Sequence, residues 1–421
     1  MFKKWLSRLL ATLIFYLPLQ IEAGGVCLYE ISSADTRLAS AGWSARADDP
    51  STVFTNPAGM TRLCGKQVEM GAQAIFGHVH FDPDSDTSIK GEDGAGNIWL
   101  PSGSFFAVHP YNENLTFGLG SLGYFGSDLV YEHNWVGRYY VQKILCEGLS
   151  IVPAAAYKIN EQWSIGAGAN IMYGFLKQRA AVHNILDIRG DGYFNFHDYR
   201  FGYGGVVGVL YEYSCNTRFG LQYLTPVNLD FRATPKFHNI GPVLDAFLRD
   251  VGIIGSSLKL HVKVPQSVML SAYHAFNPCW AFLCNVGWQQ WSRFQRVTVS
   301  FNDLNNRTLS SKNKYQDTWH AAIGLEWYYS PSLTFSGGIA YDSSAVTDSQ
   351  RQLDFPVGKQ WRFGTGARWQ ISDCLALDFS SALMWQGNLK CDVNKPVAGH
   401  VSGTFKNTYG VFINSNIIYV F

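Results

Sequence analysis

Long stretches of this chain alternate apolar residues with small or polar ones, and this pattern constrains the fold more than any other feature. Trp163–Phe175 places Trp, Ile, Ala, Tyr and Phe on one face and Ser, Gly, Asn and Met on the other. Leu333–Tyr341 and Leu375–Trp385 repeat the pattern, and the chain ends with alternating residues from Val411 to Phe421. A period of two is the spacing of a β-strand with two different faces. The sequence therefore predicts an all-β fold.

Short turn segments divide the chain into pairs of strands. They lie at Pro110–Glu113, Asn160–Glu161, Ser214–Asn216, Asn277–Pro278, Ser330–Ser332 and Ser372–Asp373. Asn, Asp, Ser and Pro each favour tight turns. The five intervals between these turns, each about 40–65 residues, have room for two strands and one longer loop. Two more strands precede the first turn and two follow the last, so we predict a 14-stranded antiparallel transmembrane β-barrel.

Composition supports a barrel over other membrane folds. Charged residues make up 15% of the chain and aromatic residues 15%, yet the mean hydropathy is −0.04. Strands that alternate lipid-facing and lumen-facing residues keep this mean near zero, unlike transmembrane helices. Aromatic residues near predicted strand ends, such as Trp163, Tyr173, Tyr341 and Trp385, favour membrane girdles over a soluble sandwich. The balance of 33 basic and 32 acidic residues argues against nucleic acid as a partner.

The first 23 residues are typical of a secretory signal peptide. Lys3, Lys4 and Arg8 precede the apolar run Leu9–Leu19, and cleavage is expected after Ala23. The run is shorter than the roughly 20 residues of a membrane-spanning helix. An exported barrel belongs in the outer membrane of a double-membraned bacterium or of a derived organelle. We expect a signal peptide at 1–23, a plugging segment or hatch at 24–65 and the barrel at 66–421.

Two segments do not alternate. Residues 24–65 are rich in turn residues and have about the size needed to fill the lumen of a 14-stranded barrel. Within Pro235–Ser257, apolar residues recur from Ile240 to Val251 at the spacing of an amphipathic helix. This helix is expected in an extracellular loop. It either packs on the crown of loops or offers an apolar surface to a greasy ligand.

The stretch Ile31–Met60, with its Asn56-Pro57-Ala58 tripeptide, resembles the N-terminal hatch of the FadL-type outer-membrane transporters. Leu260–Phe294, Thr318–Ser344 and the end at Tyr419–Phe421 are also similar to that family. The resemblance implies uptake of hydrophobic compounds, first of all long-chain fatty acids, by passive passage through a hatch-gated barrel with a lateral wall opening. Neutral aromatic hydrocarbons are the alternative cargo, and a structural or adhesive barrel is the alternative role. The terminal Phe421 resembles the signal read by the barrel-insertion machinery.

The resemblance also implies site residues for ligand binding or gating. Three of these residues belong to the hatch motif. Four belong to a kink in the family's third strand, to which Gly118–Gly126 is similar. The other five belong to the loop helix. The residues are Asn56, Pro57, Ala58, Gly123, Tyr124, Phe125, Gly126, Val243, Leu244, Phe247, Leu248 and Val251. Expected partners are a hydrophobic small molecule such as a long-chain fatty acid, the outer-membrane lipid and the insertion machinery.

One departure leaves the ligand's charge open. Fatty-acid-binding members carry basic residues near the ligand carboxylate, but Phe175 stands where such a residue is expected, with Lys177 and Arg179 just beyond. A neutral hydrophobic substrate therefore remains an alternative. We predict no catalytic residue, cofactor or metal site. His78 and His80 share a strand face, but no third ligand is evident, and we interpret them as part of a polar lumen face.

The eight cysteines lie downstream of the expected cleavage site, in a compartment that permits disulfides. We predict at least one disulfide bond, either between Cys27 and Cys64 within the hatch or to a neighbouring envelope protein. The alternative is that the thiols are free and buried.

Overall fold

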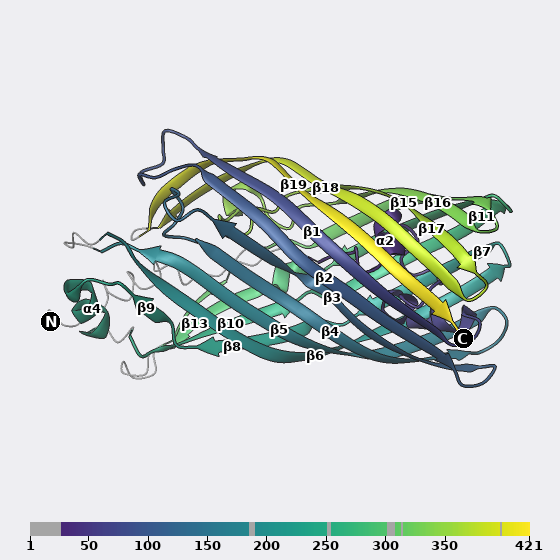
Figure 1. The fold of residues 1–421 in the computed structure, drawn as a ribbon. Coiled ribbons are helices and arrows are strands. Elements are labelled where there is room, and N and C mark those ends of the chain that lie inside the picture. The colour runs from purple at the N-terminus through teal and green to yellow at the C-terminus, as the bar shows by residue number, and fades with distance from the viewer. Residues whose placement is uncertain (1–26, 185–189, 251–253, 301–307, 313–314, 396–397) are drawn as a thin grey trace.

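The computed structural model of the 421-residue chain describes residues 27–184, 190–250, 254–300, 308–312, 315–395 and 398–421. Within these residues, fourteen antiparallel strands form a closed barrel, because β1 pairs with β19 and β5 with β6 (Figure 1). The strand number predicted from the turns is confirmed. The barrel strands are β1 (Gln67–Pro83), β2 (Gly94–Pro110), β3 (Leu115–Tyr131), β4 (Lys143–Lys158), β5 (Trp163–Val182), β6 (Gly192–Ser214), β7 (Thr217–Leu224), β11 (Ser267–Asn277), β12 (Trp280–Gln289), β15 (Thr318–Ser330), β16 (Leu333–Asp342), β17 (Gln360–Ser372), β18 (Leu375–Lys395) and β19 (Gly399–Val420).

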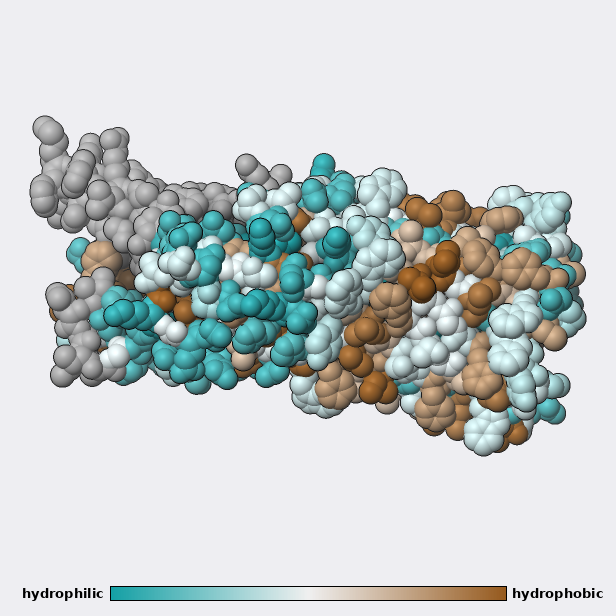
Figure 2. All heavy atoms as spheres, turned by 90° about the horizontal axis from the view of Figure 1, so that it is seen from above, coloured by the Kyte–Doolittle hydropathy of each residue, from teal (hydrophilic) through white to brown (hydrophobic). Residues whose placement is uncertain are grey.

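The two ends of the barrel differ. The six turns read from the sequence form the tight connections β2–β3, β4–β5, β6–β7, β11–β12, β15–β16 and β17–β18, all at one end, which we call the hairpin end. The longer connections lie at the opposite loop end. Strands of 17 to 23 residues, such as β1 and β6, exceed the roughly 9–11 residues that cross a bilayer. The wall therefore projects well beyond the apolar layer, and Figure 2 shows hydrophilic residues over that projecting part.

An apolar band with aromatic residues covers the outer wall (Figure 2). Cross-strand pairing places Tyr341 beside Trp361, Trp361 beside Trp385, and Trp385 beside Tyr409, and all but Tyr341 are among the strongly exposed large side chains. Aromatic girdles of this kind mark the membrane–water boundary of a barrel. His78 continues the row, with its ring 5.5 Å from that of Tyr409. The interpretation of His78 as a lumen residue is therefore wrong, because its strand parity follows the outward-facing aromatic residues.

A second sheet interrupts the wall at the loop end. It contains β8 (Val227–Ala233), β10 (Ser257–Val264), β13 (Gln295–Ser300) and β14 (Thr308–Lys312), in the order β14-β13-β10-β8. Pro226 separates β8 from β7, and Pro265 separates β10 from β11. Proline cannot donate to a β-ladder, so each strand breaks there. Sequence alternation alone did not predict this sheet.

The second sheet folds toward the inside of the barrel. Leu229 of β8 is fully buried and packs against β5 and β6, where a Cβ at Gly174 or Gly202 would lie 2.6 or 2.9 Å from its methyl carbons. The glycines therefore make room for β8. Phe231 of β8 and Leu260 of β10 are also buried, so the sheet extends the apolar interior at the loop end.

Helices are few and short. α2 (Ser33–Arg37), α3 (Thr52–Thr55) and the 3₁₀ turn η1 (Pro57–Arg62) belong to the N-terminal segment, and η2 (Trp291–Arg293) and η3 (Asp348–Gln350) belong to loops. α4 (Pro242–Asp250) follows the short strand β9 (Lys236–His238) at the loop end, within the region where a helix was expected (Figure 1). None of the helices in the described ranges is long and apolar enough to cross a membrane.

The N-terminal segment lies inside the barrel near the hairpin end, where Figure 1 shows it in purple. We call residues 27–65 the plug. Every residue from Leu28 to Met60 except Asp48 is buried, although the segment has little regular structure. Its burial comes from the wall, because α2 packs on β17, β18 and β19 while η1 packs on β4, β5 and β6.

Candidate functional site

Buried ion pairs join the plug to the wall. Arg37 of α2 lies 2.9 Å from Asp378 of β18, and Arg368 of β17 bridges Asp378 at 2.8 Å and Asp49 of the plug at 3.0 Å. Inside the plug, Arg46 pairs with Asp35 at 2.8 Å. Removing one partner of a buried pair costs about 3–5 kcal/mol because the other charge stays buried. These pairs therefore hold the plug in one position and orientation in the lumen.

The Asn56-Pro57-Ala58 turn makes a second contact between plug and wall. The side-chain oxygen of Asn56 accepts from the Ala58 N–H at 3.1 Å and so caps η1. Its amide nitrogen donates to the carbonyl of Ser44 at 2.6 Å and to that of Val209 in β6 at 3.0 Å. One buried amide thus joins two parts of the plug to the wall. Gly208 of β6 permits this close approach, because a Cβ there would collide with the Asn56 side chain.

A chain of polar contacts crosses from the plug to three wall strands. Ser40 of the plug lies 2.9 Å from Nε2 of His320 in β15, and His320 Nδ1 lies 2.8 Å from Asp342 in β16. Arg362 of β17 then joins Asp342 at 3.0 Å to Glu30 of the plug at 2.5 Å. The Ser–His–Asp order is that of a hydrolase triad, which sequence spacing had not singled out. Ser40 is 1% exposed, however, so the arrangement serves to anchor the plug.

The wall is incomplete between β2 and β3. The two strands pair at Gly96–Tyr131 and Asn97–Val130, and pairing resumes only at Ser104–Leu122. The β2 stretch 98–103 has no β3 partner, and the β3 stretch 123–129 has no β2 partner. We call this unpaired interval the wall gap. β3 is also irregular on its other side, where its register with β4 shifts between Gly123 and Phe125.

The freed part of β3 pairs with the plug instead. Leu28 donates its N–H to the carbonyl of Tyr124 at 2.8 Å, and Cys27 forms an isolated antiparallel bridge with Phe125. The Tyr124 side chain turns inward and accepts from Asn170 of β5 at 3.0 Å. Backbone groups that the wall gap leaves without a strand partner thus find partners on the plug, as buried polar groups require. The plug and the wall gap are therefore mechanically linked.

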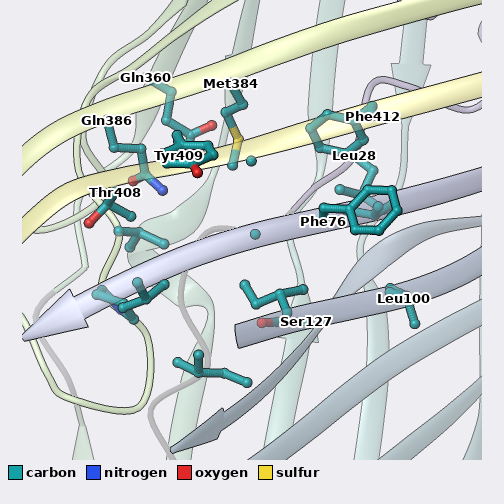
Figure 3. A pocket seen from close by; sticks show the side chains of 18 of the residues that line it. Leu28, Phe76, Leu100, Ser127, Gln360, Met384, Gln386, Thr408, Tyr409 and Phe412 are labelled. Carbon is teal, nitrogen blue, oxygen red and sulfur yellow. The ribbon is translucent and has the colours of Figure 1, made fainter. Parts of the chain in front are cut away.

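An apolar cavity of about 70 Å³ lies beside the wall gap (Figure 3). Leu28 of the plug, Ile98 and Leu100 of β2, and Gly126 and Leu129 of β3 line one part of it. β1, β17, β18, β19 and the loop before β17 supply the remainder. A dry apolar cavity of about 150 Å³ binds benzene. The cavity as it stands therefore holds only part of a ligand, and a larger one requires the surrounding groups to move.

The predicted site residues are dispersed over three places. Gly126 lines the cavity, whereas Gly123, Tyr124 and Phe125 form the kinked segment behind it. Asn56, Pro57 and Ala58 lie deeper in the barrel, against β5 and β6, and do not line this cavity. The plug residue that does line it is Leu28.

The predicted loop-helix residues form a separate surface on α4. Val243 and Phe247 are 56% and 41% exposed, whereas Leu248 is buried and Leu244 packs partly against the core. One face of α4 therefore anchors it and the other presents apolar side chains to solvent. Val251 lies outside the described residues.

Sequence reasoning missed the polar residues of the cavity. Gln360 and Arg362 of β17, Gln386 of β18 and Thr408 of β19 all line it. The available signal was the period-two run of polar residues on the inward face of β17. By contrast, Lys177 and Arg179, considered as carboxylate ligands, alternate with the buried Gln178 and so lie on the outer face of β5. Arg179 stacks on Tyr193 there, with its guanidinium 3.9 Å from the ring centre.

The predicted Cys27–Cys64 disulfide is wrong. Both residues carry free thiols. Cys27 bridges Phe125 beside the cavity, whereas Cys64 lies at the hairpin end, where its carbonyl accepts from Gln67 at the start of β1. Disulfide-bonded cysteines have Cα atoms within about 7 Å, and these two positions lie at different heights in the barrel. In the part of the chain that the structure describes, no group of three or more His, Cys, Asp or Glu residues could hold a metal ion.

A family match, related sequences and solved structures all point to the same group of proteins. Residues 15–412 match the family described as Outer membrane protein transport protein (OMPP1/FadL/TodX). The chain is 25% identical over 411 residues to the long-chain fatty acid transport protein of Escherichia coli O6:H1, covering 89% of this chain and 90% of the relative. It is 24% identical to outer membrane protein P1 of Haemophilus influenzae, covering 91% and 90%.

Solved structures show the same fold. A FadL homologue of Pseudomonas aeruginosa superposes with a TM-score of 0.84 at 19% identity, covering 94% of this chain and all of that one. The Pseudomonas putida toluene transporter TodX gives a TM-score of 0.68 at 14% identity, covering 96% and 99%.

Proposed function

Because the chain belongs to the OMPP1/FadL/TodX family of outer-membrane transport proteins, we propose that it admits long-chain hydrophobic compounds by passive diffusion through the cavity and the wall gap. The protein is an outer-membrane β-barrel and not an enzyme. Its hairpin end corresponds to the periplasmic side and its loop end to the extracellular side, as short turns and long loops do in outer-membrane barrels.

One observation carries the proposal: the apolar cavity lies directly beside the stretch of β2 that has no β3 partner. Ile98 and Leu100 belong to both the cavity and the wall gap. Trp99 between them is 54% exposed and belongs to the outer aromatic set. From Trp99 the wall gap runs toward the hairpin end, along the apolar band. A ligand that leaves the cavity through the wall gap therefore enters lipid.

Solvation supplies the driving force. Each buried CH₂ group gains about 0.8 kcal/mol relative to water, so a long chain first adsorbs on the exposed apolar face of α4. Transfer to the cavity and then to lipid keeps it out of water throughout. Movement of the plug accompanies passage, because the cavity is too small for a whole ligand and Leu28 ties the plug to Tyr124. No energy source is required, since the path runs between apolar phases.

Two cargo classes fit this path. Long-chain fatty acids are the first candidates, because relatives that are 25% identical over about nine tenths of both chains are named as their transporters. Neutral hydrophobic compounds are the second, and the structures named as toluene and monoaromatic hydrocarbon channels share this fold. One structural observation favours a neutral ligand: Arg362, the cation at the cavity, already pairs with the carboxylates of Glu30 and Asp342.

A pair of matched substitutions tests the route. Gly126→Val adds bulk at the cavity, where a Cβ would already lie 3.2 Å from neighbouring atoms of β4, whereas a Cβ at Gly123 would lie 3.6 Å or more from any atom. Uptake of a labelled long-chain fatty acid and of a labelled neutral aromatic is measured in cells with equal surface levels of each variant. We expect Gly126→Val to reduce uptake at least severalfold and Gly123→Val to leave it close to the parent.

The same assay separates transport from a structural or adhesive role. If cells that lack the protein and cells that contain it accumulate both compounds equally, the transport proposal fails. If both valine variants transport normally after correct insertion, the route through the wall gap is rejected.

A further inference from the structure

The cavity has one polar end, formed by side chains from three wall strands. Figure 3 shows Gln360, Gln386 and Thr408 toward one side of the cavity, and Leu28, Leu100 and Phe412 toward the other. A cavity that only needed to pass hydrocarbon would not require the polar side. Buried polar groups without partners are costly, so each one calls for an explanation.

Thr408 is the least satisfied of these groups. It is 2% exposed, and its hydroxyl has no hydrogen-bond partner within the described ranges. Two irregularities in the backbone of β19 direct the Thr408 side chain toward the inside of the barrel. Asn407, the preceding residue, has a left-handed backbone with φ 48°, and β19 shifts register there against both β18 and β1. Bulges of this kind re-aim side chains and are common beside functional sites.

The two glutamines present donors rather than acceptors to the cavity. The Gly358 N–H donates to the side-chain oxygen of Gln386 at 2.8 Å, and Arg362 donates to that of Gln360 at 2.9 Å. Because a backbone N–H and a guanidinium can only donate, both amide orientations are fixed. No described residue accepts from either amide nitrogen. These nitrogens and the Thr408 hydroxyl therefore remain to donate to a ligand.

Among the described residues that line the cavity, the cation is Arg362, and its charge is already paired. The guanidinium of Arg362 already contacts Glu30 at 2.5 Å, Asp342 at 3.0 Å and the Gln360 oxygen. A carboxylate ligand would therefore meet neutral donors next to two buried carboxylates, which is unfavourable in an apolar site. An uncharged oxygen would satisfy the donors without adding charge.

We propose that this polar end is a binding site for an uncharged oxygen acceptor on a long apolar ligand: a ketone, ester or alcohol, or a fatty acid in its protonated form. The proposal rests on the transport function above and names its substrate class. The oxygen accepts from Gln360, Gln386 and Thr408, while the apolar tail lies toward Leu28 and the wall gap.

The test compares three ligands of equal chain length: undecane, 2-undecanone and undecanoate. Binding to the purified full-length protein in detergent is measured at pH 8, where the acid is ionised. Thr408→Val removes the hydroxyl without a change of volume. Thr404→Val is the matched control on the same strand, because Thr404 is outside the cavity lining. Comparison between variants cancels the partition of each ligand into detergent.

We expect Thr408→Val to weaken 2-undecanone binding about fivefold, because this is about the contribution of one hydrogen bond. Undecane binding should stay unchanged. Thr404→Val should change neither. Gln386→Glu keeps an acceptor for the Gly358 N–H but replaces the donor to the ligand by a carboxylate. This variant should weaken ketone binding by a similar or larger factor.

Three outcomes would overturn the proposal. The first is equal loss of ketone and alkane binding in Thr408→Val. The second is no loss of ketone binding in either variant. The third is undecanoate binding more tightly than the ketone at pH 8, which would indicate a carboxylate site. If none of the three ligands binds the parent protein, the cavity route itself fails, and this site fails with it.

Discussion

Replacement of Asn56 by alanine should loosen the plug without weakening the barrel. The substitution removes three hydrogen bonds, to Ala58, Ser44 and Val209. Val209 lies within the β5–β6–β7 ladders, so the wall does not depend on the bond. The Ala58 N–H and the Ser44 carbonyl lose their bonds to the amide in a buried place. Each such group costs about 1–3 kcal/mol, so we expect about 2–6 kcal/mol for the two groups.

That cost should appear in the local opening of the plug. Since about 1.4 kcal/mol is a factor of ten in an equilibrium constant, the open population of the plug should rise roughly 30- to 20,000-fold. Hydrogen exchange measured by mass spectrometry would compare a plug peptide spanning residues 42–60 with a wall peptide from β6. Exchange should accelerate in the plug peptide and stay unchanged in the wall peptide.

Asn160 supplies the matched control. Its side-chain oxygen also accepts from two backbone N–H groups, those of Gln162 at 2.9 Å and Trp163 at 2.8 Å, but in an exposed hairpin. Asn160→Ala should leave plug exchange at the parental level. If Asn56→Ala shows parental exchange, parental ligand binding and parental uptake of both a fatty acid and a neutral aromatic, the plug is not the gate and the transport mechanism fails.

Three further expectations concern other parts of the molecule. Arg362→Met leaves two buried carboxylates without their cation and should destabilise the plug by about 3–5 kcal/mol; unchanged exchange of plug amides would contradict this. Phe247→Asp removes apolar surface from α4 and should lower uptake most at low substrate concentration, so an equal loss at saturating substrate would argue against capture on α4. In the purified protein Cys64 should react quickly with a maleimide and the buried Cys146 only after unfolding, and a linked Cys27–Cys64 peptide in a non-reducing digest would contradict the assigned free thiols.

The barrel could be predicted because its signals are local. A period-two pattern requires only the residues of one strand, and turn residues such as those at Asn160 and Ser214 act within three or four positions. Strand number and antiparallel order follow from these two signals. The second sheet escaped prediction because its strands alternate in the same way. Pro226 and Pro265 marked the breaks, but proline alone does not say whether a strand stops or continues in another sheet.

The site was only partly predictable for a different reason. The inward face of β17 could be read as polar, yet the sequence does not tell which inward residues are neutralised and which remain to contact a ligand. Arg362 is neutralised by Glu30, 332 positions away in the chain. The cavity itself is assembled from the plug and strands at both ends of the sequence, so no local pattern encodes it. The bulge at Asn407 likewise depends on pairing with two neighbours.

The plug fills the lumen of the barrel, whereas the wall gap lies in the side of the barrel next to the apolar cavity. This arrangement affects how well the membrane excludes ions. A hydrated ion that followed the barrel axis would have to displace a segment held by buried ion pairs such as Arg37–Asp378 and Arg368–Asp49. An ion in the apolar cavity would have to shed its water, which is prohibitive in free energy. If the protein passes oily solutes by the proposed route, we expect its single-channel conductance to stay near zero. A cell could produce it in large amounts without becoming leaky to salts or small polar antibiotics.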